Sequence, residues 1–163
     1  MISAQELRNI LQYDQETGVF TWMKKISYKA VIGNMAGSIN KDGYRVISIF
    51  GRKYYGHRLA YLYMEGEWPD DLIDHINLDP SDNRWKNIRP ANKSQNAANT
   101  SKSSGNSTGF KGVSLHAKAG KFQSHIYVNG KSKYLGLFDS PEDAHAAYQA
   151  ASNNNFKSFA RSA

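Results

Sequence analysis

A ten-residue stretch without an apolar side chain, TSKSSGNSTG at residues 100–109, divides this 163-residue chain into two parts. Segments rich in Ser and Gly behave as flexible linkers. Beyond this stretch the hydrophobic pattern changes to a period of two. A chain of this length holds one ordinary domain or two small ones. We therefore expect an α+β protein with two domains, residues 1–99 and 110–163, joined by a linker at residues 100–109.

The first part combines helical and strand-like patterns. Ser3 and Glu6 form a capping-box pattern, followed by apolar residues at helical spacing, which predicts a helix over residues 3–11. The other expected elements are a turn at residues 13–18, strands at residues 19–22, 44–50 and 53–57, and a helix at residues 59–64 that Gly66 can end.

Residues 73–99 are the stretch best suited to carry chemistry. Asp74 and His75 are adjacent, Asn87 follows twelve residues after His75, and Asn96 follows nine residues later. A strand at residues 73–75, a polar loop, a second strand holding Asn87, and a short helix beginning at Ser94 are the expected local structure. A turn with a solvated acid and a surface imidazole is the alternative.

This stretch resembles the HNH endonuclease motif of the ββα-metal type. The matching residues are Asp74-His75, Asp82-Asn83-Arg84, Asn87-Ile88-Arg89 and Gln95-Asn96-Ala97-Ala98-Asn99. The resemblance implies that His75 is the general base and that Asp74 and Asn96 bind one divalent metal ion. It also implies that Asn87 braces the loop and orients His75. Asn96 stands where many members of the family have histidine.

The residue types suit phosphodiester hydrolysis. Such a reaction needs an activated water, relief of charge on the phosphate and help for the leaving oxygen, and a metal ion can supply the last two. Asp74 and Asn96 offer hard oxygen donors, which suit Mg²⁺ or Mn²⁺ better than zinc. His75, with an ordinary pKa of roughly 6.5, can accept a proton near neutral pH.

Cations lie close to the acids of this stretch. Arg84, Arg89 and Lys93 are candidate phosphate contacts, with a solvated rim as the alternative. The HNH resemblance extends back through His57-Arg58, and Arg58 is a candidate catalytic contact to the scissile phosphate. A hydrogen bond from Arg58 to a nearby carbonyl is the structural alternative.

The overall composition limits the partners. The formal net charge is +7, so polyanions are favoured. There is no cysteine, which excludes disulfides and thiolate zinc sites, and we expect no structural zinc and no small-molecule cofactor. No apolar run approaches the ~20 residues that span a bilayer, so we expect a cytoplasmic protein without membrane contact.

The second part has the pattern of a small antiparallel sheet with one helix. Strands are expected at residues 110–115, 121–128 and 132–137, with a hairpin turn at Asn129-Gly130. Ser140 and Pro141 begin a helix that packs on the sheet. The opposite face of the sheet, together with Lys111, is a candidate DNA-binding surface, with a stabilising module as the alternative. Its residues are Ser114, His116, Gln123, His125, Tyr127, Ser132 and Tyr134.

Charge favours DNA as the partner of this part. Residues 101–163 hold eight Lys and Arg against three Asp and Glu, a net +5, whereas residues 1–100 have a net +2. A sheet placed in a major groove can read base edges.

This part resembles the plant ethylene-response-factor (APETALA-type) DNA-binding domain. The matching residues are Phe110-Lys111-Gly112-Val113, Lys121-Phe122, Tyr134-Leu135-Gly136-Leu137-Phe138, Glu142-Asp143-Ala144, Ala147-Tyr148 and Phe159-Ala160-Arg161. Plant members carry several arginines on the sheet face, where this chain has Ser114, His116 and Tyr127, so the plant target sequence does not carry over.

Together these resemblances imply a metal-dependent DNA endonuclease of the homing type that acts on double-stranded DNA at a site chosen by its C-terminal domain. A monomer on DNA is expected, and the resemblance suggests a phage source. Two alternatives stay open: a DNA-binding transcriptional regulator with an inactive nuclease half, and an RNA-binding accessory protein.

Overall fold

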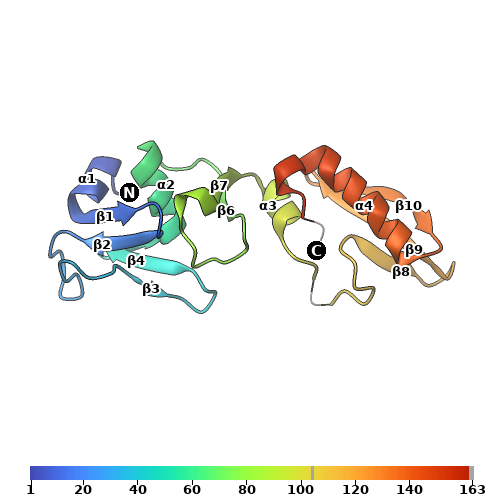
Figure 1. The fold of residues 1–163 in the computed structure, drawn as a ribbon, viewed down its shortest axis with the longest axis horizontal. Helices are drawn as coiled ribbons and strands as arrows, with labels where there is room; N and C mark the ends of the chain where they lie inside the picture. The colour runs from blue at the N-terminus through green and yellow to red at the C-terminus, as the bar shows by residue number, and fades with distance from the viewer. Residues whose placement is uncertain (104, 162–163) are drawn as a thin grey trace. The chain divides into compact units, whose positions relative to one another are not determined.

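The computed structural model describes residues 1–103 and 105–161 of an α+β protein (Figure 1). By its internal contacts the chain forms two compact units, Met1–Pro90 and Ala91–Ala163. The division by contacts falls before the polar stretch, so residues 91–99 are counted with the second unit. The linker at residues 100–109 and the domains on either side of it stay a prediction. Ser104 of that linker, and Ser162 and Ala163 of the predicted second domain, lie outside the described residues.

The first unit contains short helices and three small sheets. The elements are α1 (Ala4–Ile10), β1 (Leu11–Asp14), β2 (Val19–Trp22), β3 (Ser38–Ile39), β4 (Arg45–Ile49), β5 (Arg52–Tyr55), α2 (Gly56–Glu65), β6 (Leu72–His75), the 3-10 helix η1 (Trp85–Asn87) and β7 (Ile88–Ala91). The sheets are β1-β2, β3-β4-β5 and β6-β7. Their buried faces share one core with the helices, which includes Leu7, Phe20, Ile47 and Leu59.

Local signals place the ends of both helices. Ser3 and Glu6 form the expected capping box at α1. Gly66 ends α2 in the left-handed conformation, as predicted. The strand predicted at residues 53–57 stops earlier, at Tyr55, and α2 begins at Gly56. His57 and Arg58 therefore lie in the first turn of a helix.

The turn predicted at residues 13–18 was wrong for its first two residues. Tyr13 and Asp14 belong to β1, which pairs in register with β2 from Leu11 opposite Trp22 to Asp14 opposite Val19. Tyr13 is buried and stacks on Phe20, with ring centroids 4.7 Å apart. Pairing with a partner strand and burial therefore override the turn-forming pattern.

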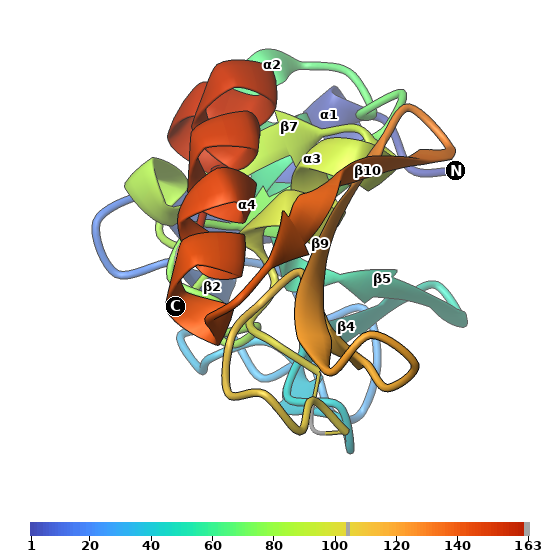
Figure 2. The ribbon, with the colours of Figure 1, turned by 90° about the vertical axis from the view of Figure 1, so that its right-hand side faces the viewer.

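The second unit contains α3 (Lys93–Asn99), β8 (Val113–His116), β9 (Lys121–Val128), β10 (Lys131–Phe138), α4 (Pro141–Phe156) and the 3-10 helix η2 (Lys157–Phe159). The sheet is antiparallel in the order β10-β9-β8, and Figure 2 shows α4 running along it. Ala98 of α3 shares the core of this unit with Ile126, Tyr148 and Phe156. The predicted three-stranded sheet packed on one helix is confirmed.

Backbone conformation explains the strand boundaries of this sheet. Asn129 and Gly130 both have positive φ, at 50° and 80°, as the predicted hairpin turn requires. The first strand begins at Val113 rather than at residue 110. Gly112 has a φ of 77°, and a Cβ there would lie 2.0 Å from the ring of Tyr148, so the chain turns tightly against α4 before β8 can start.

Within residues 1–103 and 105–161, none of the helices has the length and apolar character that crossing a membrane requires.

Candidate active site

Asp74 and His75 are the last two residues of β6, and both are buried, at 4% and 7% exposure. β6 pairs with β7, and the amide of Ile76 just beyond β6 donates to the carbonyl of Asn87 at 2.8 Å. The backbone pairing therefore brings the acid and the imidazole close to Asn87 within the first unit. A buried carboxylate and imidazole do not fit the alternative of a solvated acid and a surface imidazole.

Asp74 forms a buried ion pair. Its Oδ2 lies 2.9 Å from Nε of Arg89, whose side chain is 15% exposed. Arg89 is one of the predicted DNA contacts, but its guanidinium here faces the carboxylate. The pair fixes the orientation of Asp74 and offsets its charge.

Asn87 ties together the loop that follows β6. Its Nδ2 donates to Oδ1 of Asn77 at 3.0 Å and to the carbonyl of Asp82 at 2.8 Å, while its Oδ1 accepts from the amide of Asn77 at 3.1 Å. Asn87 ends η1 instead of lying in the second strand as predicted, because β7 begins at Ile88. These side-chain bonds join the start of the loop to its end.

Asn83 contacts His75 directly, although its position in the sequence predicted no separate role for it. Oδ1 of Asn83 lies 3.2 Å from Nε2 of His75, and Asn83 is 1% exposed. Asn83 belongs to the Asp82-Asn83-Arg84 motif, but as one of several asparagines in a polar loop it had no distinguishing signal of its own.

His57 packs against His75 from the first turn of α2. The two ring centroids are 4.9 Å apart in an edge-to-face arrangement. The ring centroid of Tyr44 lies 5.4 Å from that of His57 and 6.0 Å from that of His75. Burial lowers the pKa of the His57 imidazole to about 3, and the charges of His75 and Arg58 act in the same direction. His57 is therefore neutral at physiological pH and adds no charge beside His75.

Arg58 points to the backbone of the segment before β6. Its guanidinium donates to the carbonyl of Asp71 at 3.0 Å and to that of Pro69 at 3.0 Å. These bonds correspond to the structural alternative for Arg58. They hold the approach to β6 in place, whereas the contact to a scissile phosphate stays a prediction.

The two remaining predicted DNA contacts of residues 73–99, Arg84 and Lys93, belong to different units. Arg84 pairs with Asp82 through its Nε at 2.7 Å. Lys93 is exposed in the first turn of α3, which belongs to the second unit. α3 is capped by Asn92 with Gln95, and not by Ser94 as predicted. Ser94 instead accepts a hydrogen bond from the amide of Asn129 at 2.9 Å.

Asn96, the second predicted metal ligand, lies in α3 and is half-buried. Asp74 and Asn96 thus belong to different compact units. Among residues 1–103 and 105–161 no three His, Cys, Asp or Glu side chains gather as a metal site would require. By donor type, the carboxylate of Asp74 and the carboxamide of Asn96 are each hard oxygen ligands of the kind that suits Mg²⁺.

The predicted sheet surface of the second unit is present as one face. Strand register places Ser114 opposite Gln123, His116 opposite Lys121, Tyr134 opposite His125, and Ser132 opposite Tyr127. Because directly paired residues share a face and alternate residues return to it, all seven predicted side chains lie on the same side of the sheet. Ser124 and Ile126 are buried on the side that faces α4.

Lys111 is directed elsewhere. Its ammonium donates to the carbonyls of Ala98 and Thr100, both at 2.6 Å, and lies 3.4 Å from that of Ala97. Burial lowers the pKa of the Lys111 ammonium to about 8, and the charge of Arg161 acts in the same direction. At neutral pH the ammonium is still mostly protonated, so it caps the C-terminal end of α3. This placement accounts for Lys111 without a contact to DNA.

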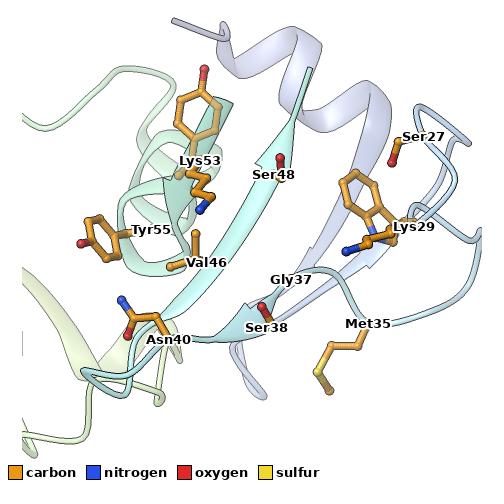
Figure 3. A pocket seen from close by; sticks show the side chains of 12 residues that line it. Ser27, Lys29, Met35, Gly37, Ser38, Asn40, Val46, Ser48, Lys53 and Tyr55 are labelled. Atoms are coloured by element: carbon orange, nitrogen blue, oxygen red, sulfur yellow. The ribbon is translucent and has the colours of Figure 1, made fainter. Parts of the chain in front are cut away.

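A concave surface with a volume of about 750 Å³ lies in the first unit, over β3 and β4. Figure 3 shows Lys29 and Lys53 on either side of β4, with Met35 and Tyr55 at the margin of the concave surface. The lining includes two lysines, Trp22 and several hydroxyl groups, and it contains no carboxylate. Such a surface suits a polyanion.

A family comparison matches one segment of the chain. Residues 54–98 match the family model described as HNH endonuclease. This segment runs from β5 through α2, β6 and β7 into α3, and it contains Asp74, His75, Asn87 and Asn96. Over this segment the chain matches the HNH endonuclease family, so the predicted resemblance to that family is confirmed there. The likeness of the second unit to the ethylene-response-factor domain stays a prediction.

Two known proteins are similar over a longer part of the chain. An uncharacterized HNH endonuclease of Acanthamoeba polyphaga mimivirus is 30% identical over 124 residues, which make up 75% of this chain and 63% of that protein. A solved structure of DNA binding and cleavage by the HNH homing endonuclease I-HmuI is 24% identical, with a TM-score of 0.46, and the match covers 59% of this chain and 54% of that one. The chain thus spans less than two thirds of either relative.

Proposed function

We propose that this protein is a metal-dependent DNA endonuclease of the homing type, which hydrolyses phosphodiester bonds at a site selected by its second domain. The observation that carries the proposal is the buried, adjacent pair of Asp74 and His75 at the end of β6, within the segment that matches the HNH endonuclease family. Burial of an acid and an imidazole side by side is costly unless their chemistry is used or their partners compensate it.

His75 is the general base in this proposal. It takes the proton from the attacking water, which then forms the new bond to phosphorus as the bond to the leaving oxygen breaks. Asn87 restrains the loop after β6 through Asn77 and Asp82, so the imidazole is held on a rigid support. His57 stays neutral beside His75 and does not oppose the positive charge that develops on it.

Asp74 and Asn96 are the residues that would hold the metal ion. HNH nucleases typically use one divalent ion, and a carboxylate with an amide oxygen fits Mg²⁺ or Mn²⁺ by donor type. When bound, the ion would neutralise charge on the phosphate and stabilise the leaving oxygen. Arg89 orients the Asp74 carboxylate for this role.

The second domain would supply the choice of site. Its polar and aromatic sheet face and the net charge of +5 over residues 101–163 favour duplex DNA as the partner. We propose that it is an ethylene-response-factor-like reader. Lys29 and Lys53 of the concave surface are further candidate phosphate contacts.

A DNA-binding regulator with an inactive nuclease half is the second candidate. The observation in its favour is the ion pair of Asp74 with Arg89, since a carboxylate held by a guanidinium competes with a metal ion for its own oxygens. In that case DNA binding would persist without any metal-dependent cutting.

Plasmid nicking with Mg²⁺ separates the two candidates. We expect the wild type to nick supercoiled DNA, His75→Ala and Asp74→Ala to lose at least about 100-fold in rate, and chelation to abolish cutting. Asp70→Ala is the matched control, because Asp70 is an exposed acid just before β6. Metal-dependent cutting that survives in His75→Ala would refute the assigned base, and tight DNA binding by an inert wild type would favour the regulator.

A further inference from the structure

Asn83 is the most deeply buried polar side chain beside the candidate base. It lies in the loop between β6 and η1, is 1% exposed, and places Oδ1 at 3.2 Å from Nε2 of His75. A fully buried loop asparagine is uncommon, and its amide has to be hydrogen-bonded to be tolerated there.

The second hydrogen bond of Asn83 fixes which end of the amide faces His75. Nδ2 of Asn83 donates to the carbonyl of Ser81 at 3.2 Å. Since a carbonyl can only accept, this end must be the NH₂ group, and the oxygen must be the atom directed at His75. An amide oxygen accepts and never donates, so Nε2 of His75 carries the proton. In the neutral ring the lone pair then lies on Nδ1.

The backbone of Asn83 is held in a close-fitting site. The hydroxyl of Tyr13 donates to its carbonyl oxygen at 2.6 Å. A Cβ at Gly18, where φ is +72°, would lie 2.5 Å from the carbonyl carbon of Asn83, and a Cβ at Gly56 would lie 3.0 Å from Nδ2. Parts of the chain far apart in sequence therefore leave Asn83 little freedom to shift or turn.

The contacts of Asn87 differ from those of Asn83. Asn87 was expected to orient His75, but its amide oxygen and nitrogen bond to Asn77 and to the carbonyl of Asp82. The ring of His75 instead meets the oxygen of Asn83 at Nε2 and the ring of His57 across 4.9 Å.

We propose that Asn83 is a positioning residue for His75, whose side-chain oxygen holds the Nε2–H tautomer and thereby makes Nδ1 the nitrogen that takes the proton from water. This inference rests on the proposed role of His75 as the base. The tautomer itself is a property of the folded protein, whether or not the protein cuts DNA.

Nitrogen NMR of the full-length protein labelled with ¹⁵N-histidine tests the tautomer without any activity. At pH 8, the signals of His75 are identified by their loss in His75→Gln, among five histidines. We expect a pyrrole-type Nε2 and a pyridine-type Nδ1 in the wild type, and a mixture of tautomers in Asn83→Ala. The opposite tautomer in the wild type, or an unchanged one in a folded Asn83→Ala variant, would overturn the inference.

Cleavage kinetics test the consequence for the reaction. Asn83→Ala should lower kcat by about 10- to 100-fold, because the His75 ring loses both the bond that orients it and part of its Nε2–H form. KM should stay unchanged, because DNA binding does not depend on the tautomer of His75. Asn83→Asp keeps an acceptor facing Nε2 but loses the donor to the Ser81 carbonyl, so it should keep the Nε2–H tautomer and restore only part of the rate. Ser81→Ala keeps the Ser81 carbonyl and should behave as wild type.

Failure of the role proposed for Asn83 can be distinguished from failure of the proposed endonuclease function. If Asn83→Ala does not fold, the tautomer of His75 in the wild type and in Asn83→Asp tests the role of Asn83 instead. Loss of the Nε2–H form in a folded Asn83→Asp variant would refute that role. An unchanged kcat in a folded Asn83→Ala variant would also refute it. A wild type that never cuts DNA would refute the proposed function, while the wild-type Nε2–H tautomer would still be observed.

Discussion

Nε of Arg89 lies 2.9 Å from Oδ2 of Asp74, so the carboxylate predicted to bind a metal ion is already paired with a cation inside the first unit. The Asp74 side chain is only 4% exposed. If the guanidinium is removed, water cannot reach the carboxylate to replace it. The same ion pair therefore affects both the stability of the first unit and the carboxylate predicted to bind the metal ion.

Arg89→Ala should therefore destabilise the protein by about 3 kcal/mol, because it leaves a buried carboxylate without this partner. Urea unfolding measures the loss, and added Mg²⁺ should recover part of it, since a bound cation replaces the missing charge. Arg84→Ala, which breaks a more exposed pair with Asp82, should cost about 1 kcal/mol or less. Equal losses in the two variants would contradict the burial argument.

His57 should make the stability of the first unit depend on pH. Its pKa is about 3 in the folded protein and roughly 6.5 when unfolded, so the unfolded chain binds the extra proton between these values. Stability is complete above about pH 6.5 and falls by up to about 1.4 kcal/mol per pH unit as the pH drops toward 3.

Replacing His57 with Phe keeps an aromatic ring and removes this titration. Nδ1 of His57 is buried and has no hydrogen-bond partner within the described residues, so the change loses no bond there. The measurement is urea unfolding of both proteins between pH 4.5 and pH 7.5. We expect a shallower decline in His57→Phe, and parallel curves would show that another group is responsible.

Gly112→Ala should be far more harmful than a glycine replacement nearby. Both Gly112 and Gly109 have positive φ, at 77° and 81°, but only Gly112 has an atom within 4 Å of an added Cβ, the Tyr148 ring at 2.0 Å. Gly109→Ala should cost about 1 kcal/mol from backbone strain, and Gly112→Ala about 3 kcal/mol or more from strain and overpacking. Thermal unfolding followed by circular dichroism compares the two, and equal shifts would argue against close packing of α4 on this turn.

Lys111→Met should affect folding and leave DNA binding largely intact. It removes an ammonium bonded to the carbonyls of Ala98 and Thr100, which should cost about 1–3 kcal/mol. The logarithmic dependence of DNA affinity on salt concentration should keep its slope, because no phosphate contact is lost. A slope that becomes shallower by about one would instead show that Lys111 contacts phosphate, as predicted from the sequence.

The concave surface over β3 and β4 can be tested through the same salt slope. Replacing both Lys29 and Lys53 with Gln should make the slope shallower by about two if both contact phosphate. The double variant of Lys24 and Lys25 to Gln removes the same charge from exposed lysines outside the lining, and it should change the slope less. Identical slopes for the two double variants would show that the lost net charge, and not a phosphate contact of Lys29 and Lys53, changes the salt dependence.

Short-range signals made much of the fold predictable. The capping box of Ser3 with Glu6, the left-handed Gly66 and the Asn129-Gly130 turn each act over a few residues, and each stands where expected. The start of α3 shows the limit, since both Asn92 and Ser94 are good caps. A long-range bond from the amide of Asn129 occupies Ser94, which the local sequence does not reveal.

The candidate site was predictable only where its residues are close in sequence. Asp74, His75 and Asn87 fall within one stretch whose spacing matches a known motif. The contacts of His57 and Asn83 with His75 depend on burial created by α2 and by the turn after β1. The loop contains several asparagines in similar local sequence, so only the folded structure distinguishes Asn83 from the others.

The bonds that hold α3 have a consequence for engineering. Lys111 and the amide of Asn129 attach this helix, which carries Asn96, to the sheet of the second unit. A chimera spliced at the polar stretch would separate Asn96 from the residues that anchor its helix. A splice before Asn92 would transplant Asn96 together with the N-cap and the anchors of its helix, so exchanging second units to test the proposed choice of site should succeed best at that junction.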